Sequence, residues 1–232
     1  MNRKTPKTIG VLGGMGPEAT ALFFQRIVDL TPAKVDQNHI PVLIYNNPQI
    51  PDRTKGILKQ GEDPLPELLR SLALLEQAGA DFVCIPCNSA HFYYEQMASQ
   101  CKVEILNLIQ EVLEACLQEN GDYETVGLLA TSGTIQSQLY QQAFQKRGIA
   151  VIVPDAWELK DLQSVIYRIK GKTKNVVAVE AFARQLVKKG AQAVILGCTE
   201  LSLVQSELSL AVPIFDSLEV LAKRAVQLAL TR

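Results

Sequence analysis

Two cysteines occupy equivalent places in two similar stretches of this sequence. Cys87 follows the apolar run 82–85 and a proline, and Cys198 follows the apolar run 193–196 and a glycine. Gly79 and Gly190 precede the two runs, and each glycine and each cysteine lies 111 residues from its counterpart. Ligands bind at the carboxyl ends of parallel strands, so we expect the two thiols to approach one ligand site from opposite sides.

A pair of thiols suits the inversion of a carbon stereocentre that carries an acidic hydrogen. Inversion needs a base on one face and an acid on the other, and the roles exchange in the reverse direction. A free cysteine has a pKa near ~8.5 and serves in either role. We expect helices beginning at Asn88 and Thr199 to tune the two thiols. A single thiol assisted by His91 would instead indicate acyl transfer or decarboxylation, but His91 has no counterpart in the second half, so we expect a structural role.

Other cysteine chemistry fits the sequence less well. Cys84 and Cys87 form a C-x-x-C pair, but Cys84 lies inside an apolar run and is expected to face the core. Zinc would need further ligands, and the two histidines, His39 and His91, are not at zinc-finger spacing. Five cysteines without a secretory signal argue against a disulfide framework. The alternative that both repeated cysteines are ordinary core residues conflicts with their placement after Pro86 and a glycine.

The composition is that of an ordinary globular protein. The 232 residues are 47% hydrophobic and 20% charged, with a net charge of −1 and 6% aromatic residues. This net charge and aromatic content do not indicate a surface that binds nucleic acid or a membrane. No apolar run reaches the ~18 residues that span a membrane, and the basic N-terminus is followed by a strand pattern rather than a signal peptide. We therefore expect a cytoplasmic protein.

Two loops in the first half are suited to binding an anion. The glycine-rich turn 13–17 offers backbone N–H groups at a helix start. It does not complete a dinucleotide fingerprint, because Ala19 stands where the last glycine belongs, so a small carboxylate suits it better. Arg53 lies on the polar loop 46–54, which two prolines stiffen. Its guanidinium matches a carboxylate, although a solvated surface arginine is the alternative.

The second half of the chain repeats the first. Three matched segments, at spacings that drift from 117 to 109 residues, indicate a duplicated set of βα units. Helices are expected at 17–30, 65–77, 176–188 and 219–230, and the helix through 111 should stop near Asn120 and Gly121. We predict an α/β fold of two pseudo-symmetric domains, each an open, mainly parallel sheet flanked by helices, with the active-site cleft between them.

The motifs resemble one known family. Segments 13–17, 47–54, 86–91 and 197–200 are similar to the aspartate/glutamate racemase superfamily, most closely its aspartate racemase branch, and the similarity covers essentially the whole chain. It implies two pseudo-symmetric domains, here 1–103 with 212–232 and 104–211, that commonly pair as homodimers. It implies no pyridoxal phosphate or metal, and proton transfer at Cα by Cys87 and Cys198 from opposite faces.

The resemblance also implies a set of substrate contacts. Arg53 and Lys170, with Lys172 as a fallback, would bind the side-chain carboxylate. Glu200 stands where glutamate racemases carry histidine, which favours the aspartate branch. The remaining expected contacts are Met15, Asn88, Ser89, Thr131 and Thr199.

The resemblance, together with the two opposed thiols, implies an isomerase that interconverts L- and D-aspartate. A broad aspartate/glutamate racemase, a hydantoin racemase and a maleate or other diacid isomerase are related alternatives. Hydantoins are uncharged and would leave Arg53 and Lys170 without a role. From another class, a non-catalytic binder of acidic amino acids would use the same cleft.

Overall fold

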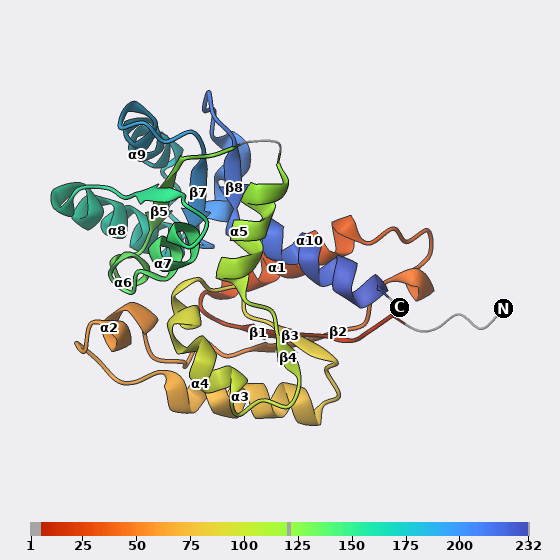
Figure 1. The fold of residues 1–232 in the computed structure, drawn as a ribbon. Helices are drawn as coiled ribbons and strands as arrows, with labels where there is room; N and C mark the ends of the chain where they lie inside the picture. Colours follow the sequence, from red (N-terminus) through yellow and green to blue (C-terminus); the bar gives the residue numbers. More distant parts are fainter. Residues whose placement is uncertain (1–5, 120–121, 232) are drawn as a thin grey trace.

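The computed structural model describes residues 6–119 and 122–231 and contains two four-stranded parallel sheets (Figure 1). The first sheet has the order β2-β1-β3-β4, with β1 (Ile9–Gly13), β2 (Val42–Asn46), β3 (Phe82–Cys84) and β4 (Glu104–Ile105). The second has the matching order β6-β5-β7-β8, with β5 (Thr125–Ala130), β6 (Ala150–Ile152), β7 (Val194–Gly197) and β8 (Ile214–Asp216). The predicted pair of similar parallel sheets is confirmed.

The central strands are apolar on both faces because helices cover both. Every residue of β1, β3 and β7 is buried, as expected for parallel strands between two helical layers. The first half contributes α1 (Pro17–Leu30), η1 (Asp36–Asn38), α2 (Arg53–Ile57), α3 (Leu65–Gln77), η2 (Ser89–Tyr93), α4 (Tyr94–Ala98) and α5 (Leu108–Gln118). The second contributes α6 (Ser132–Gln136), α7 (Leu139–Gln145), α8 (Ala156–Lys170), α9 (Val176–Lys188), η3 (Leu201–Leu203), η4 (Gln205–Glu207) and α10 (Ser217–Leu230).

Local signals set where the long helices begin. Pro17 occupies the first turn of α1, where a missing N–H costs nothing. Asp155 and Glu158 form a capping box at the start of α8. The Asn175 side chain accepts a hydrogen bond from the Ala178 N–H at the start of α9. The helices predicted at 17–30, 65–77 and 176–188 are confirmed; the stop predicted near 120–121 lies outside the described residues.

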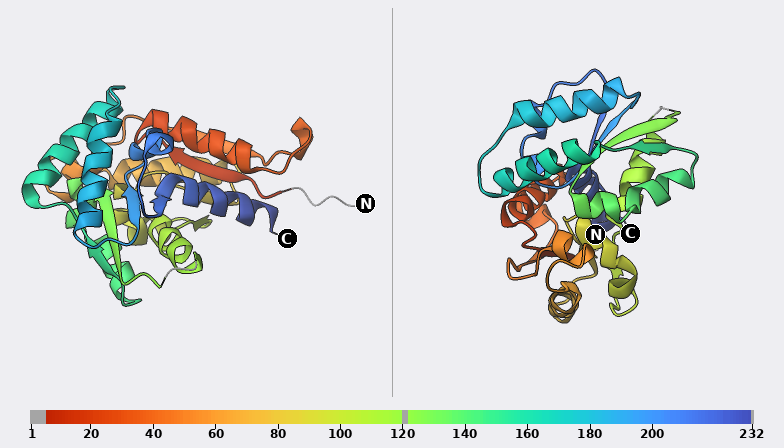
Figure 2. Two further views of the ribbon diagram at one scale, coloured as in Figure 1. Left: turned by 90° about the horizontal axis from the view of Figure 1, so that it is seen from above. Right: turned by 90° about the vertical axis from the view of Figure 1, so that its left-hand side faces the viewer.

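The two halves are joined by helices that cross between them. Helix α10 follows the last strand of the second sheet but packs along α1 of the first half, and α5 packs against both α10 and α7 (Figure 2). One buried apolar cluster therefore contains side chains from both halves, including Phe23 of α1, Tyr140 of α7 and Leu221 of α10. Two further buried apolar clusters lie one on each sheet, the first with residues of the first half and the second with residues of the second half.

Strand pairing departs in two places from the limits expected for the domains. Strand β4 starts at Glu104 yet pairs with β3 of the first sheet, and β8 lies within 212–232 yet pairs with β7 of the second. Each sheet thus keeps its fourth strand, and only the helix that follows the strand crosses to the other half. The division of the chain into two domains, 1–103 with 212–232 and 104–211, stays a prediction.

None of the helices in the described part of the chain is both long enough and apolar enough to cross a membrane.

Candidate active site

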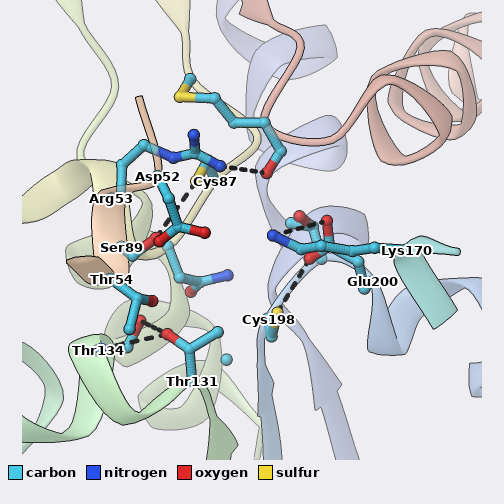
Figure 3. Close-up of a pocket in the computed structure, with 14 residues that line it drawn as sticks. Asp52, Arg53, Thr54, Cys87, Ser89, Thr131, Thr134, Lys170, Cys198 and Glu200 are labelled. Atoms are coloured by element: carbon cyan, nitrogen blue, oxygen red, sulfur yellow. Dashed lines mark hydrogen bonds and ion pairs between the residues drawn. The ribbon is translucent and has the colours of Figure 1, made fainter. Parts of the chain in front are cut away.

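The two repeated cysteines lie on one small cavity between the sheets (Figure 3). Cys198 directly follows β7, and Cys87 lies three residues beyond β3, because that strand ends at Cys84 and not at Ile85 as predicted. Their exposed fractions are 4% for Cys87 and 5% for Cys198. The strand ends of both halves therefore deliver a thiol to the same enclosed space.

All ten residues named from the sequence line this cavity. They are Cys87, Cys198, Met15, Arg53, Asn88, Ser89, Thr131, Lys170, Thr199 and Glu200. The fallback, Lys172, lines a different hollow beside Pro17 and Leu203.

Four further lining residues escaped the sequence analysis: Asp52, Thr54, Thr134 and Gly197. Asp52 and Thr54 flank Arg53, and Thr134 lies one helical turn beyond Thr131. Their closeness in sequence to Arg53, Thr131 and Cys198 could have indicated them. The local sequence does not show which of these residues face the cavity.

Cys198 has a carboxylate as its hydrogen-bond partner. Its Sγ donates to Glu200 Oε2 at 3.0 Å, and Lys170 Nζ lies 3.7 Å from Glu200 Oε1. Burial and then the charge of Glu200 raise the pKa of the Cys198 thiol well above its ordinary value, while Lys170 opposes that effect. Burial is the largest effect on the pKa of Lys170 and lowers it, but Glu200, Cys198 and Cys87 together outweigh burial, so the pKa of the lysine is raised.

Cys87 has a neutral partner instead. Its Sγ lies 3.5 Å from Ser89 Oγ. Its carbonyl oxygen lies 2.9 Å from His91 Nδ1, and the Leu108 N–H donates to His91 Nε2 at 3.1 Å. Nε2 is therefore the acceptor and Nδ1 carries the proton. Burial lowers the pKa of His91 and keeps the ring neutral, so His91 supports the loop of Cys87, as predicted.

Asn88 does not cap the helix after Cys87, contrary to expectation. It stands at the N-cap position, directly before the first residue of η2, but its side chain makes no capping bond. Its Oδ1 accepts from the Tyr140 hydroxyl at 2.6 Å, and its Nδ2 donates to Ser217 Oγ at 2.9 Å. The Ser217 hydroxyl in turn donates to the Leu196 carbonyl at 2.7 Å. Buried hydrogen bonds thus connect the residue after Cys87 to β7, the strand that Cys198 directly follows.

The helix expected after Cys198 is also different. The segment forms only the three-residue turn η3, and Glu200 rather than Thr199 precedes it. So short a turn has no summed peptide dipole of the kind that a long helix provides, and the expected dipole effect on Cys198 is wrong. Thr199 instead donates from Oγ1 to the Pro86 carbonyl at 3.1 Å, which ties the two cysteine loops together.

Arg53 is buried at the start of α2, not on a loop as the sequence suggested. Its Nη1 donates to the carbonyls of Ile50 and Pro51, and its Nη2 donates to the carbonyl of Met15 at 3.3 Å. Its Nε is buried and has no hydrogen-bond partner. A buried donor without a partner is costly, so this nitrogen is a place for an oxygen of a bound anion.

Hydroxyl groups line the side of the cavity that α6 forms. The Thr131 Oγ1 accepts from the Thr134 N–H and lies 3.0 Å from Thr134 Oγ1. Thr131 therefore caps α6 while its side chain faces the cavity. The described residues contain no group of three or more His, Cys, Asp or Glu side chains that could hold a metal ion, and Cys84 is fully buried in the core, as predicted.

The cavity is almost closed. Its volume is about 10 Å³, room for about one water molecule. A second hollow of about 340 Å³ shares Asp52, Arg53 and Lys170 with it and adjoins the glycine-rich turn. Between the two halves, Tyr167 donates to Asp52 Oδ2 at 2.9 Å. Burial opposes the ionisation of Asp52, but bonds from the Lys55 N–H and from Tyr167 lower its pKa. In this conformation the cavity is therefore too small to hold an amino acid.

Comparisons with known proteins agree with this architecture. The family model for Asp/Glu/hydantoin racemases matches residues 12–225. A broad specificity amino-acid racemase, RacX of Bacillus subtilis (strain 168), is 29% identical over 224 residues, which cover 94% of this chain and 96% of that protein. The aspartate racemase of Picrophilus torridus superposes with a TM-score of 0.84 at 29% identity, covering 97% of this chain and 95% of that one. An aspartate racemase homologue from Pyrococcus horikoshii gives a TM-score of 0.76 at 26% identity, with 96% and 99% coverage.

Proposed function

The chain belongs to the Asp/Glu/hydantoin racemase family and is a racemase, and we propose that it interconverts L- and D-aspartate by proton transfer between Cα and two cysteines. One observation carries the proposal: Cys87 and Cys198 line the same cavity from equivalent strand ends of two pseudo-symmetric halves. This arrangement suits a thiol on each face of one substrate carbon.

In the proposed reaction one thiolate removes the proton from Cα, and the electrons of the C–H bond stay on the carbon. The opposite thiol gives its proton to the other face, so one cysteine gains a proton and the other loses one. Cations and donors near the carboxylates stabilise the negative charge that develops. The enzyme needs no cofactor in this scheme, because both proton carriers belong to the chain.

The polar groups of the cavity support a diacid as substrate. Arg53 and Lys170 are the cations assigned to the carboxylates, and the free Nε of Arg53 offers a donor. Glu200 Oε1 is also buried without a hydrogen-bond partner and is assigned to the substrate ammonium group. We assign Met15, Asn88, Ser89, Thr131 and Thr199 to the remaining contacts. The choice of aspartate over the longer glutamate rests on the similarity to an aspartate racemase, and one methylene contributes only ~1–3 kcal/mol to discrimination.

The test follows deuterium incorporation at Cα and enantiomer composition when L- or D-aspartate is incubated with the protein in D2O. We expect exchange with inversion from both enantiomers, and loss of inversion in Cys87→Ala and in Cys198→Ala. Cys101→Ala is the matched control, because Cys101 is partly exposed and away from the cavity. Inversion that persists in either cavity variant contradicts the two-cysteine mechanism.

Substrate breadth is decided by the same assay with other amino acids. The similarity to a broad specificity amino-acid racemase makes glutamate and neutral amino acids necessary comparisons. If the protein exchanges deuterium into many amino acids with no preference for aspartate, it is a broad specificity racemase and the aspartate assignment is wrong. Exchange with none of them indicates a binder or a diacid isomerase. The family resemblance also leads us to propose a homodimer, which sedimentation of the purified protein tests. The composition leads us to propose a cytoplasmic location, which fractionation of cells tests.

A further inference from the structure

The two cysteines are equivalent in sequence but have chemically different partners. Cys87 lies 3.5 Å from the hydroxyl of Ser89, and Cys198 lies 3.0 Å from the carboxylate of Glu200. Each partner stands two residues after its cysteine. Ser89 and Glu200 are therefore counterparts under the internal duplication, and the difference at this position gives the two thiols chemically different partners.

The two partners act on a thiol in opposite ways. An ionised carboxylate has only acceptor sites, so the contact with Glu200 is a hydrogen bond only while Cys198 keeps its proton. A serine hydroxyl can donate, so Ser89 can hydrogen-bond to a thiolate at Cys87. The carboxylate therefore favours the thiol at Cys198, and the hydroxyl tolerates the thiolate at Cys87.

We infer that the resting enzyme is asymmetric, with the proton held on Cys198 by Glu200 and with Cys87 as the base that meets the substrate. Glu200 is here a positioning residue that acts through Cys198, in addition to the substrate contact assigned to it. The inference rests on the proposed function for its catalytic meaning, but the protonation order is a property of the free protein.

The other charged groups around Cys198 do not reverse this order. Lys170 is the nearest cation, but its Nζ is directed to the Glu200 carboxylate at 3.7 Å. Burial and Glu200 together raise the pKa of Cys198 despite Lys170. The remaining titratable and charged groups of the described residues that line the cavity or interact electrostatically with its lining residues include Asp52, Arg53, Cys87, Tyr93, Tyr140 and Tyr167.

The protonation state of the two cysteines at rest decides which of them reacts first as the base. The Cys87 thiolate takes the proton from Cα, and the carbanion takes the proton of the Cys198 thiol on its other face. The enzyme is left with a thiol at Cys87 and a thiolate at Cys198, next to the negative Glu200. One proton must return from Cys87 to Cys198 through solvent or through a second substrate of opposite hand before the resting state is restored.

The experiment titrates each thiol in the absence of substrate. Ultraviolet absorbance of thiolate is followed with pH for the wild type, Cys87→Ala and Cys198→Ala, and the differences give one curve for each cysteine. We expect Cys87 to ionise at lower pH than Cys198. In Glu200→Gln the midpoint of Cys198 should fall by at least one pH unit, a tenfold rise in its thiolate fraction. Glu200→Asp, which keeps the charge, should retain most of the wild-type midpoint.

Glu207→Gln is the matched control, because Glu207 is an exposed glutamate on the neighbouring turn η4. It should leave both curves unchanged. Ionisation of Cys198 at or below the pH of Cys87 in the wild type overturns the inference, and that comparison does not depend on whether Glu200→Gln folds. An unchanged Cys198 midpoint in a folded Glu200→Gln also overturns it. No substrate takes part, so failure here leaves the racemase assignment standing, and absent racemisation leaves the titration valid.

Discussion

Removal of one buried hydroxyl, in Tyr140→Phe, tests whether the contacts around Asn88 hold the first cysteine loop in place. The Tyr140 ring is fully buried and packs against Phe144. Its hydroxyl donates to Asn88 Oδ1 at 2.6 Å, and Asn88 is the residue after Cys87. Phenylalanine keeps the ring and its packing, so the substitution removes the hydrogen bond and little else.

The expected cost follows from the burial of the acceptor. Asn88 is 2% exposed, so its Oδ1 has no access to bulk water once Tyr140 no longer donates to it. An unsatisfied buried group costs about 1–3 kcal/mol. A protein of this size loses about 2–4 °C in Tm for each kcal/mol, so Tm should fall by about 2–12 °C. The Asn88 amide would then be held only by Ser217, and we expect kcat/KM to fall about tenfold, which corresponds to ~1.4 kcal/mol.

The assay combines urea unfolding and thermal unfolding with racemisation kinetics. Ser217→Ala removes the bond on the other side of the amide and should act in the same direction. Tyr45→Phe is the control, because Tyr45 is exposed on the edge strand β2. Unchanged stability in Tyr140→Phe refutes the energetic reasoning. Lower stability with unchanged kcat/KM refutes the positioning role and leaves Tyr140 as a packing residue.

Two further predictions concern stability. Gly14 has a φ of +95°, and an added Cβ would meet the Asn47 backbone at 2.3 Å, whereas Gly79 has a φ of +91° and open space around it. We therefore expect Gly79→Ala to cost about 1–2 kcal/mol from backbone strain alone and Gly14→Ala to cost clearly more, as measured by urea unfolding; equal costs contradict the steric argument. Burial raises the pKa of Asp216 from 3.8 to about 6, against hydrogen bonds from Ser202 and the Leu218 N–H that lower it. The folded state then binds more protons than the unfolded state between these two values, so this carboxyl reduces stability as pH rises through that window. Asp216→Asn should gain up to about 3 kcal/mol relative to the wild type between pH 4 and pH 8, and a difference that is independent of pH contradicts the assignment.

The sequence alone determined the fold class and most of the candidate site. Buried parallel strands are continuous apolar runs, long helices carry their own caps, and the duplication is visible as a nearly constant spacing between motifs. These signals are local or repetitive, so they are readable without coordinates. Cys87 and Cys198 were found this way, because each follows a strand and so lies at the sheet edge where ligands bind.

Short elements were not predictable in the same way. Arg53 was expected on a loop and lies instead in α2, a helix of five residues, which is too short for a helical period to show. Asp52, Thr54 and Thr134 were missed because polar residues in turns look alike until the chain is folded.

Only the tertiary structure decided what each side chain of the cavity contacts. Asn88 binds Ser217, 129 residues away, and the Thr199 hydroxyl binds the Pro86 carbonyl, 113 residues away. The crossing of α5 and α10 between the halves brings such partners together. The different partners of the two thiols were likewise not predictable from the sequence. Only the folded turns show that Ser89 and Glu200 each direct a side chain at a sulfur atom. Hydrogen bonds and pKa values depend on distances of a few ångströms, and only the packing of the two halves sets those distances.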